Sequence, residues 1–400
     1  MKRDLRFCNK AVFAALVVLV CFASLAFAED KAPIKIGLMV PYTGALSFGG
    51  NGVDKGFRFG LEEAGYKVAG RTIELLKEDD EAKPEVGITK VHKLIEYDKV
   101  NILAGINHSG VALAVRDIVV SHKIPLIITN AGAVKLTSTL KSPYIFRTSF
   151  ANGQQDLAGG WYAYNKMRYR RMVVVAADFV AGHEKADAFM KAFKAAGGQI
   201  TQQIYPPLGT SDFGPYLTNI DTATNSAVWA FESDQDGIRF IQQYQEYGLK
   251  QKLPLFVIGD TVDDSLLPSM KDAALGTLNY LHYANTLDTP ANQKFVKAYF
   301  ARYKEFPSFY AEEGYVGAKA ILLALQAVHG NVENTDAFLA ALRQVKFEAP
   351  RGPFRFDADQ NAVIPVYIRK VEKVDGRYAN VVIDTIPNVD QNWVPPDQKK

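Results

Sequence analysis

Short apolar runs alternate with amphipathic segments over most of this 400-residue sequence. The first run, residues 34–40, leads into a loop rich in glycine and proline, and an amphipathic segment then ends near residue 64. Apolar runs separated by helical patterns indicate βαβ units and so predict parallel sheets covered on both faces. Ligands bind such sheets at the C-terminal edge, where the loops after the strands collect.

The alternation forms two series that meet near residue 150, and helical and then strand-like patterns follow. The predicted strands of the two series are residues 34–40, 72–76, 100–104, 126–129, 172–176, 227–231 and 255–258. Later helical patterns cover 292–303, 312–328 and 335–345, and the runs between 352 and 384 resemble strands. The start of a second series near residue 150, together with the chain length, predicts two α/β domains. We expect the β-rich tail to complete the edge of a sheet.

Residues 1–28 have the composition of a signal peptide. Basic residues precede an apolar stretch over 11–27, and Ala26, Phe27 and Ala28 form an A-x-A cleavage signature. We therefore expect export to the periplasm with cleavage after Ala28. Two alternatives stay open. One is an uncleaved membrane anchor, since the stretch is nearly long enough to span a bilayer, and the other is a lipoprotein signal at Cys21.

Charge and cysteine content argue against several classes of partner. The sequence has 46 basic and 43 acidic residues, and loss of residues 1–28 removes four basic residues and Asp4, which leaves 42 of each. A neutral chain gives no indication of nucleic acid or of an anionic membrane surface. Both cysteines, Cys8 and Cys21, lie in the predicted signal, so no disulfide is expected.

No catalytic or metal-binding motif in the sequence is complete. Residues 49–52 resemble a phosphate-binding loop but lack the lysine and hydroxyl of the GxxxxGK[ST] pattern. His183 and Glu184 begin like a zinc-protease motif, yet Asp187 stands where its second histidine belongs. Ser109 lacks the GxSxG context of a nucleophile. We expect no enzyme, no catalytic residue, no metal and no cofactor. The glycine-rich loop could still hold a carboxylate on backbone N–H groups, or be only a turn.

Loops after the first-half strands carry small polar residues that suit an anionic ligand. Residues 107–110 (Asn-His-Ser-Gly) open a helix, and residues 130–132 (Asn-Ala-Gly) follow the next strand. Hydroxyls and backbone N–H groups at such positions suit a carboxylate. Ser109 and Asn130 can equally be capping or turn residues. Arg147 either pairs with a ligand carboxylate or locks the strand that crosses to the second half, and we favour the second role.

The second half offers matching loops and aromatic residues. Residues 178–182 and 231–234 follow predicted strands, and Asp260 follows the strand over 255–258. Phenylalanines that could wall a pocket between two lobes stand at positions 48, 150, 179 and 231, although core packing would explain each of them as well.

Six segments are informative through their order and spacing. They are IKIGLMVPYTG at 34–44, IELLKEDD at 73–80, IPLIITNAGA at 124–133, YIFRTS at 144–149, QQYQEYGLK at 242–250 and YAEEGYVGAKA at 310–320. With them the chain resembles, over nearly all of residues 34–385, the type I periplasmic solute-binding proteins of ABC importers, in the Leu/Ile/Val-binding class.

This resemblance implies an α/β fold of two doubly wound parallel-sheet lobes joined by a three-strand hinge. The implied crossings lie near 148–152, 279–284 and 350–356, with lobe 1 formed by 34–148 and 284–350, and lobe 2 by 152–279 and 356–390. It also implies a periplasmic receptor that closes its lobes on a small-molecule ligand and delivers it to membrane permease subunits. We expect a monomer.

Departures from the class bear on the ligand. Amino acid binders usually place Ser or Thr at both first-lobe strand ends, whereas Asn130 and Ala131 stand near the second. The usual second-lobe tyrosine is absent from Val180, Ala181 and Gly182, and Asp260 corresponds to the acid that meets a ligand ammonium group. The segments HSGVAL, FRTSFANGQ and DFVAGHE are similar to a subgroup linked to aromatic acids.

The leading hypothesis is a receptor for a small aromatic carboxylate of benzoate or hydroxycinnamate type, whose carboxylate meets Ser109 and backbone N–H groups near Ala131. Branched-chain or other aliphatic amino acids are the alternative ligands, and a sensory module that reports to a membrane kinase is an alternative role. The predicted ligand-binding residues are Tyr42, Phe48, His108, Ser109, Asn130, Ala131, Phe150, Asn152, Phe179, Ala181, Phe231, Ser233 and Asp260.

Overall fold

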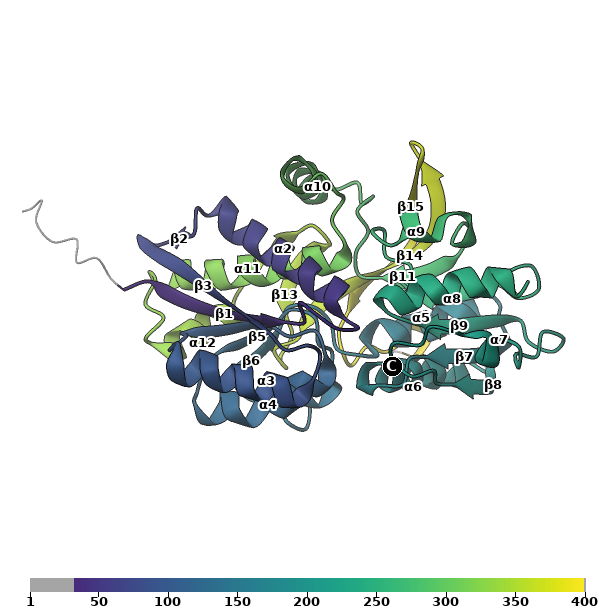
Figure 1. The fold of residues 1–400 in the computed structure, drawn as a ribbon, viewed down its shortest axis with the longest axis horizontal. Helices are drawn as coiled ribbons and strands as arrows, with labels where there is room; N and C mark the ends of the chain where they lie inside the picture. The colour runs from purple at the N-terminus through teal and green to yellow at the C-terminus, as the bar shows by residue number, and fades with distance from the viewer. Residues whose placement is uncertain (1–31, 399–400) are drawn as a thin grey trace, which may run out of the picture.

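The computed structural model describes residues 32–398, which form two α/β lobes side by side (Figure 1). Each lobe is built on its own sheet. The predicted signal peptide and its cleavage site lie outside the described residues. Within 32–398, the search for a helix long and apolar enough to cross a membrane finds none.

The first lobe holds a six-stranded sheet in the order β2-β3-β1-β4-β5-β6. Its strands are β1 (Ile34–Val40), β2 (Lys67–Val68), β3 (Arg71–Asp79), β4 (Ile102–Gly105), β5 (Leu126–Ile128) and β6 (Ile145–Arg147). All neighbours pair in parallel except β2, which is antiparallel to β3.

Helices cover both faces of the first sheet. The helices of this lobe are α2 (Ser47–Glu63), α3 (Pro84–His92), α4 (Ser109–Ser121), α10 (Pro290–Tyr303), α11 (Phe309–Ala327) and α12 (Thr335–Arg343). Because side chains of a strand alternate between faces, Leu38 joins the core formed with α2 and α11, and Met39 joins the core formed with α3 and α4.

The second lobe holds a nine-stranded sheet in the order β12-β13-β14-β11-β10-β9-β7-β8, with β15 paired to β14. Its strands are β7 (Arg171–Ala176), β8 (Gln199–Ile204), β9 (Ala227–Phe231), β10 (Leu255–Ile258), β11 (Leu278–Leu281), β12 (Lys346–Ala349), β13 (Gly352–Phe356), β14 (Ala362–Val374) and β15 (Arg377–Val389). The sheet is parallel from β8 to β11 and antiparallel from β14 onward, so the C-terminal strands complete its edge.

Helices also cover both faces of the second sheet. They are α5 (Gln154–Asn165), α6 (Val180–Ala195), α7 (Gly214–Leu217), α8 (Asp234–Glu246) and α9 (Leu267–Met270). Val174 of β7 shares a core with α5 and α6, whereas Val173 shares one with α7, α8 and α9. The predicted fold class, two doubly wound α/β lobes, is confirmed.

The chain passes between the lobes three times, after β6, between β11 and α10, and after α12. β12 pairs with β13, which connects residues 346–349 to the nine-stranded sheet. The lobe boundaries stay predictions.

The glycines at 49–52 lie in a helix and not in the predicted loop, because α2 begins at Ser47. A Cβ atom on Gly50 would lie 2.0 Å from the carbonyl oxygen of Pro41, and one on Gly56 would lie 1.8 Å from that of Ala311. These glycines therefore let α2 approach the first strand and α11 more closely than any larger residue would allow.

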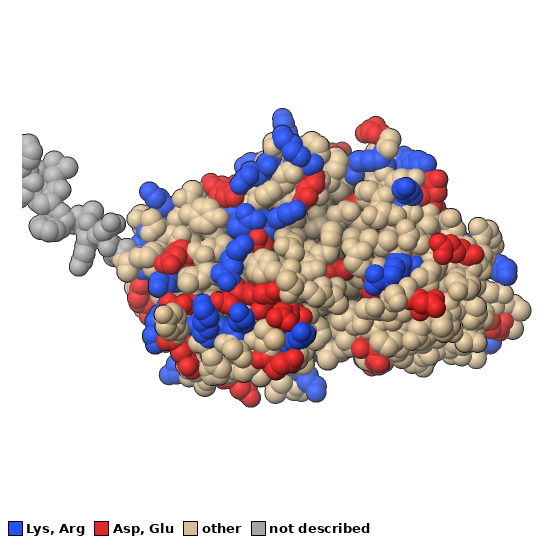
Figure 2. All heavy atoms as spheres, viewed as in Figure 1, with Lys and Arg blue, Asp and Glu red and all other residues tan. Residues whose placement is uncertain are grey.

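Charged side chains of both signs are interspersed on the face seen in Figure 2, and they are denser over the first lobe than over the second. Ion pairs such as those of Lys93 with Glu78 and Asp98 bring opposite charges together in the first lobe. The mixture of signs agrees with the neutral charge deduced for residues 29–400.

Candidate ligand-binding site

A cavity of about 30 Å³ lies where the two lobes meet. Its walls are the C-terminal ends of strands and the first turns of helices, which is where open α/β sheets bind ligands. The predicted residues on it are Ser109, Asn130, Phe150, Asn152, Phe179, Ala181, Phe231, Ser233 and Asp260. The residues that complete it are Leu46, Gly49, Asn107, Gly132, Lys185 and Tyr310.

Three phenylalanines form an apolar side of the cavity. Phe150, Phe179 and Phe231 line it, and the rings of Phe179 and Phe231 lie 5.9 Å apart between centroids. The ammonium group of Lys185 stands 4.4 Å from the ring centroid of Phe150 and 4.9 Å from that of Phe231. The cation and the ring faces attract each other, so the rings help to hold this lysine in a largely dry site.

Lys185 forms an ion pair with Asp260 inside the cavity. Lys185 Nζ lies 3.4 Å from Asp260 Oδ2, and the two side chains are 2% and 6% exposed. Asp260 Oδ1 is buried and has no hydrogen-bond partner among residues 32–398. The acid expected to meet a ligand ammonium group therefore already has a cationic partner, and one of its oxygens is free to accept.

Sequence reasoning missed Lys185, although a signal for it exists. Ala181, Lys185, Phe189 and Phe193 recur every four residues along α6, and all four are buried. A lysine in the apolar stripe of a helix is rare unless it is paired, so it marks a polar site. Asn107 and Tyr310 also line the cavity without having been predicted. Asn107 directly precedes the predicted His108, whereas no local sequence pattern marks Tyr310 as a site residue.

In the first lobe, donors gather where α4 begins. Ser109 Oγ accepts a hydrogen bond of 3.2 Å from Asn152 Nδ2, so its own hydroxyl hydrogen stays available to a ligand. Asn107 is buried, and both polar atoms of its side chain lack a partner among the described residues. Free backbone N–H groups at a helix N-terminus favour an anion, and these two side chains add to them.

Four of the predicted residues lie outside the cavity. Tyr42 Oη donates to Asp54 Oδ1 at 3.1 Å, and Phe48 packs edge-on against Tyr310 next to surface grooves. His108 caps α4 by accepting from the N–H of Val111, as the capping alternative allowed. The N–H of Ala131 donates to Ile106 O and is therefore not available to a ligand carboxylate.

Arg147 has the structural role that the sequence favoured. It is fully buried, and its guanidinium donates to Gly132 O, Phe150 O, Ala133 O and Thr137 Oγ1. These bonds join the loop after β5 to the passage into the second lobe. Burial lowers the pKa of Arg147 to about 10, so it stays charged at neutral pH.

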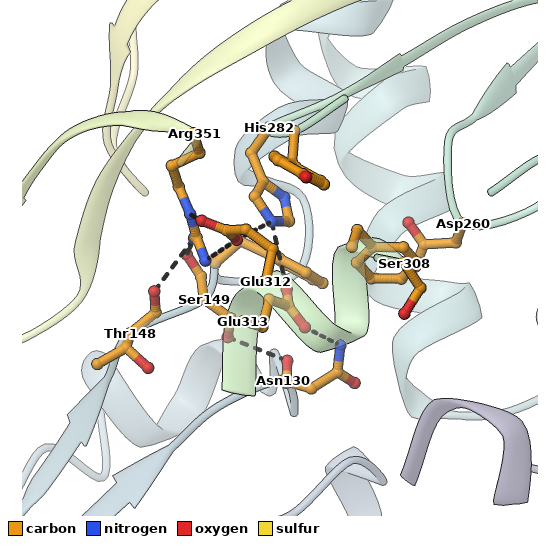
Figure 3. Close-up of polar contacts among 12 residues, drawn as sticks. Asn130, Thr148, Ser149, Asp260, His282, Ser308, Glu312, Glu313 and Arg351 are labelled. Atoms are coloured by element: carbon orange, nitrogen blue, oxygen red, sulfur yellow. Dashed lines mark hydrogen bonds and ion pairs between the residues drawn. The ribbon is translucent and has the colours of Figure 1, made fainter. Parts of the chain in front are cut away.

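A buried polar cluster lies beside the cavity, where the passages between the lobes meet (Figure 3). Arg351 donates to both carboxylate oxygens of Glu312, with 2.8 Å from Nε to Oε1, and its Nη1 donates to Thr148 O at 3.2 Å. His282 Nε2 lies 3.5 Å from Glu313 Oε1. Glu313 Oε2 accepts from Asn130 Nδ2 at 2.8 Å, and this bond links the cluster to the cavity.

Burial dominates the titration of this cluster. It raises the pKa of Glu312 and raises that of Glu313 well above the usual range, while it lowers the pKa of His282 far below its usual value. Both shifts favour the neutral forms of His282 and Glu313, and the Arg351–Glu312 pair compensates its own charges. Within residues 32–398, no group of three or more His, Cys, Asp or Glu side chains is arranged to hold a metal ion.

Comparison with known proteins agrees with this geometry. A family described as periplasmic binding protein matches residues 33–377. The Leu/Ile/Val-binding protein homolog 6 of Brucella suis biovar 1 (strain 1330) is 31% identical over 389 residues, which are 94% of this chain and 97% of that protein.

Two solved structures share the fold along nearly their whole length. An ABC transporter substrate-binding protein from Sphaerobacter thermophilus is 45% identical with a TM-score of 0.85, over 90% of this chain and 99% of that chain. A solute binding protein of an ABC transporter from Rhodopseudomonas palustris BisB5, in complex with 3,4-dihydroxy benzoic acid, is 34% identical with a TM-score of 0.85, again over 90% and 99%.

Proposed function

This chain belongs to the periplasmic binding protein family, and we propose that it captures a small aromatic carboxylate of benzoate or hydroxycinnamate type. It is the solute-binding component of an ABC transporter and not an enzyme. Proteins of this kind act outside the cytoplasmic membrane and interact with permease components. That this chain acts as a monomer and is cleaved after Ala28 is part of the proposal.

The apolar side of the cavity is the observation that carries the ligand proposal. Phe150, Phe179 and Phe231 offer ring faces and edges to a flat apolar body, and ring pairs of this kind contribute about 0.5–1.5 kcal/mol beyond area burial. The Rhodopseudomonas palustris BisB5 protein, which was crystallised with an aromatic acid, supports the same class of ligand.

The ligand carboxylate would lie against the first lobe. Ser109 can donate its hydroxyl hydrogen, Asn107 can donate from an unpartnered Nδ2, and the first turn of α4 adds backbone N–H groups. Charge-assisted hydrogen bonds of this type are about twice as strong as neutral ones. The predicted contact with the N–H of Ala131 is replaced in this proposal by Asn107, because Ala131 N–H is already bonded.

An aliphatic amino acid is the second candidate, since the Brucella relative is named a Leu/Ile/Val-binding protein. Asp260 is the residue that would meet its ammonium group. The ion pair of Asp260 with Lys185 counts against it, because a ligand ammonium would compete with Lys185 and would bring two positive charges together. An aromatic acid without an amine avoids this conflict.

Calorimetry on the ligand-stripped protein tests the proposal. The exported chain, residues 29–400, is unfolded in guanidinium, refolded, and titrated with benzoate, 4-hydroxybenzoate, 4-hydroxycinnamate, leucine and valine. We expect saturable binding of at least one aromatic acid. Binding of leucine or valine with no response to the aromatic acids would overturn the proposal. Asp260→Ala should abolish amino acid binding but should not weaken the binding of benzoate, which has no amine.

A further inference from the structure

The carboxamide of Asn130 is held in one orientation by a buried acid. Asn130 follows β5 and lines the cavity, and its Nδ2 donates to Oε2 of Glu313, a fully buried residue in the first turns of α11. In Figure 3 the amide nitrogen points to Glu313 and the carbonyl oxygen points away from it. A reversed amide would place Oδ1 against Glu313 Oε2, and two acceptors cannot form a hydrogen bond.

The rest of the buried cluster keeps Glu313 Oε2 an acceptor. His282 Nε2 faces the other oxygen, Oε1, at 3.5 Å. If Glu313 is protonated on Oε1, the oxygen that faces the unpartnered Nε2 of His282, then Oε2 stays an acceptor. If Glu313 is ionised, both oxygens accept. The Arg351–Glu312 pair balances its own charge nearby, so neither state of Glu313 reverses the amide of Asn130.

This orientation decides what the cavity offers to a ligand. Asn130 Oδ1 has no hydrogen-bond partner among residues 32–398, and the same is true of Asp260 Oδ1, which comes from the opposite lobe. Two residues that line the same small cavity, one from each lobe, therefore each carry an acceptor without a donor. A buried acceptor left unpaired, as Asp260 Oδ1 is, is unfavourable, so a ligand that brings a donor is favoured over one that does not.

We propose that Glu313 is a positioning residue that turns Asn130 into an acceptor, and that the site selects aromatic carboxylates with a ring hydroxyl that donates to Asn130 Oδ1 or Asp260 Oδ1. The inference rests on the proposed function, because it refines the ligand of the same cavity. On this inference the cavity excludes ligands whose ring oxygen has been methylated, since a methyl ether can accept a hydrogen bond but cannot donate one.

Calorimetric titrations of ligand-stripped protein with matched pairs test the ligand class. The pairs are 3- and 4-hydroxybenzoate with 3- and 4-methoxybenzoate, and benzoate is the reference. At least one hydroxybenzoate should bind tenfold or more tightly than both its methyl ether and benzoate. Equal affinities for hydroxylated, methylated and unsubstituted acids would overturn this inference and leave the proposed function intact. Failure of every aromatic acid to bind would overturn the proposed function itself.

Two variants of Glu313 test its positioning role. Glu313→Gln keeps an acceptor for Asn130 and a donor for His282, so the preference for hydroxybenzoate over benzoate should persist. Glu313→Leu removes the acceptor and frees the amide to rotate, so this preference should fall at least threefold. A residue that only supports the fold would weaken both ligands equally, and an unchanged preference in Glu313→Leu would contradict the inference.

Asn130→Ala provides the same test at the cavity wall. The substitution removes the acceptor itself and leaves the buried cluster of Glu313, His282 and Arg351 in place, so folding is less at risk than in Glu313→Leu. We expect the preference for hydroxybenzoate to fall as far as in Glu313→Leu, or further. A preference at the wild-type level in Asn130→Ala would overturn the role of Asn130.

Discussion

Tyr310 Oη donates a hydrogen bond of 3.0 Å to Asp234 Oδ1 across the boundary between the lobes. Tyr310 lies in α11 of the first lobe, and Asp234 opens α8 of the second. Asp234 Oδ2 accepts from the backbone N–H of Gly49 at 3.1 Å, so one carboxyl group joins the second lobe to two elements of the first. We expect opening of the hinge to break both bonds, so that Asp234 acts as a latch of the closed form.

Tyr310→Phe should weaken ligand binding about two- to tenfold. The variant loses one hydrogen bond that exists only when the lobes are closed, and such a bond contributes about 0.5–1.5 kcal/mol. Calorimetry with the best aromatic acid measures the change. Tyr315→Phe is the matched control, because Tyr315 Oη bonds to Glu63 within the first lobe. An equal loss in both variants would show that the contact with Asp234 has no special role.

Ligand affinity should fall as pH rises from about 4 to about 7, and the latch carboxyl is the reason. Burial, followed by the charges of Asp260 and Asp263, raises the pKa of Asp234 from 3.8 to about 7, against the hydrogen bonds from Gly49 and Tyr310, which lower it. A raised carboxyl pKa means that the closed form binds the proton more tightly than the open form. Protonated Asp234 therefore stabilises the closed form fully below the open-state pKa. This stabilisation is lost as pH approaches 7.

Asp234→Asn separates this effect from other titrations. The amide cannot ionise, so the difference between wild-type and variant affinities should change between pH 5 and 7 and level off above pH 7. The pH profile is measured by calorimetry with one aromatic acid, whose own carboxylate stays ionised in this range. Parallel profiles of the two proteins would assign the pH dependence to Asp263 or to another group.

Lys185→Met should shift ligand preference towards amines. Without the ammonium group, Asp260 has no cationic partner and can pair with a ligand ammonium, whereas an aromatic carboxylate would meet an uncompensated negative charge. We expect aromatic acids to bind at least tenfold more weakly. Lys191→Met, at an exposed position of α6, is the control and should bind like the wild type. Unchanged affinity for aromatic acids in Lys185→Met would show that Lys185 has no role in ligand selection.

Arg351→Met should destabilise the protein by about 3–5 kcal/mol, because it leaves Glu312 buried without its partner. Urea-induced unfolding followed by circular dichroism measures the loss. The double variant Arg351→Met with Glu312→Leu should recover most of the stability, since an apolar pair needs no charge compensation. A double variant as unstable as the single one would place the effect in the lost contact of Arg351 with Thr148 O.

Gly56→Ala should destabilise the protein, although alanine favours helices by about 1 kcal/mol over glycine. The new Cβ atom would lie 1.8 Å from Ala311 O, so α2 and α11 would have to move apart. Overpacking of this kind costs about 1–3 kcal/mol. The control is Asn51→Ala, at an exposed position of the same helix. Thermal unfolding measures the stability of both variants. A Gly56→Ala variant that is more stable than the wild type would contradict the close contact between α2 and α11.

Local patterns were sufficient for most of the fold. Apolar runs such as residues 34–40 and 227–231 became strands with the predicted bounds, because a strand buried on both faces needs a continuous apolar run. The edge strand β8, with the sequence QITQQI, gives no such signal because its exposed positions admit polar residues. Positions at or after strand ends, such as Ser109, Phe231 and Asp260, reached the cavity because parallel strands end at one edge.

Local patterns could not predict the functions of the glycine-rich segment and of Arg147. The sequence left open whether residues 49–52 hold a carboxylate. The N–H of Gly49 does hold one, but it belongs to Asp234, 185 positions further along the chain. The sequence favoured a structural role for Arg147 but could not name its partners. Three of its four buried acceptors come from residues 132–137, which only folding brings near.

By itself, the sequence determined two α/β lobes and the loops that surround the cavity, because these follow from periodicity and strand order. Six sequence segments indicated the family by resemblance. Tertiary structure alone decided that Lys185 neutralises Asp260, that Asp234 joins the lobes, and that Glu313 orients Asn130. Each of these pairs joins residues from different elements. Their chemistry depends on burial and on a few ångströms of distance, which no spacing along the chain encodes.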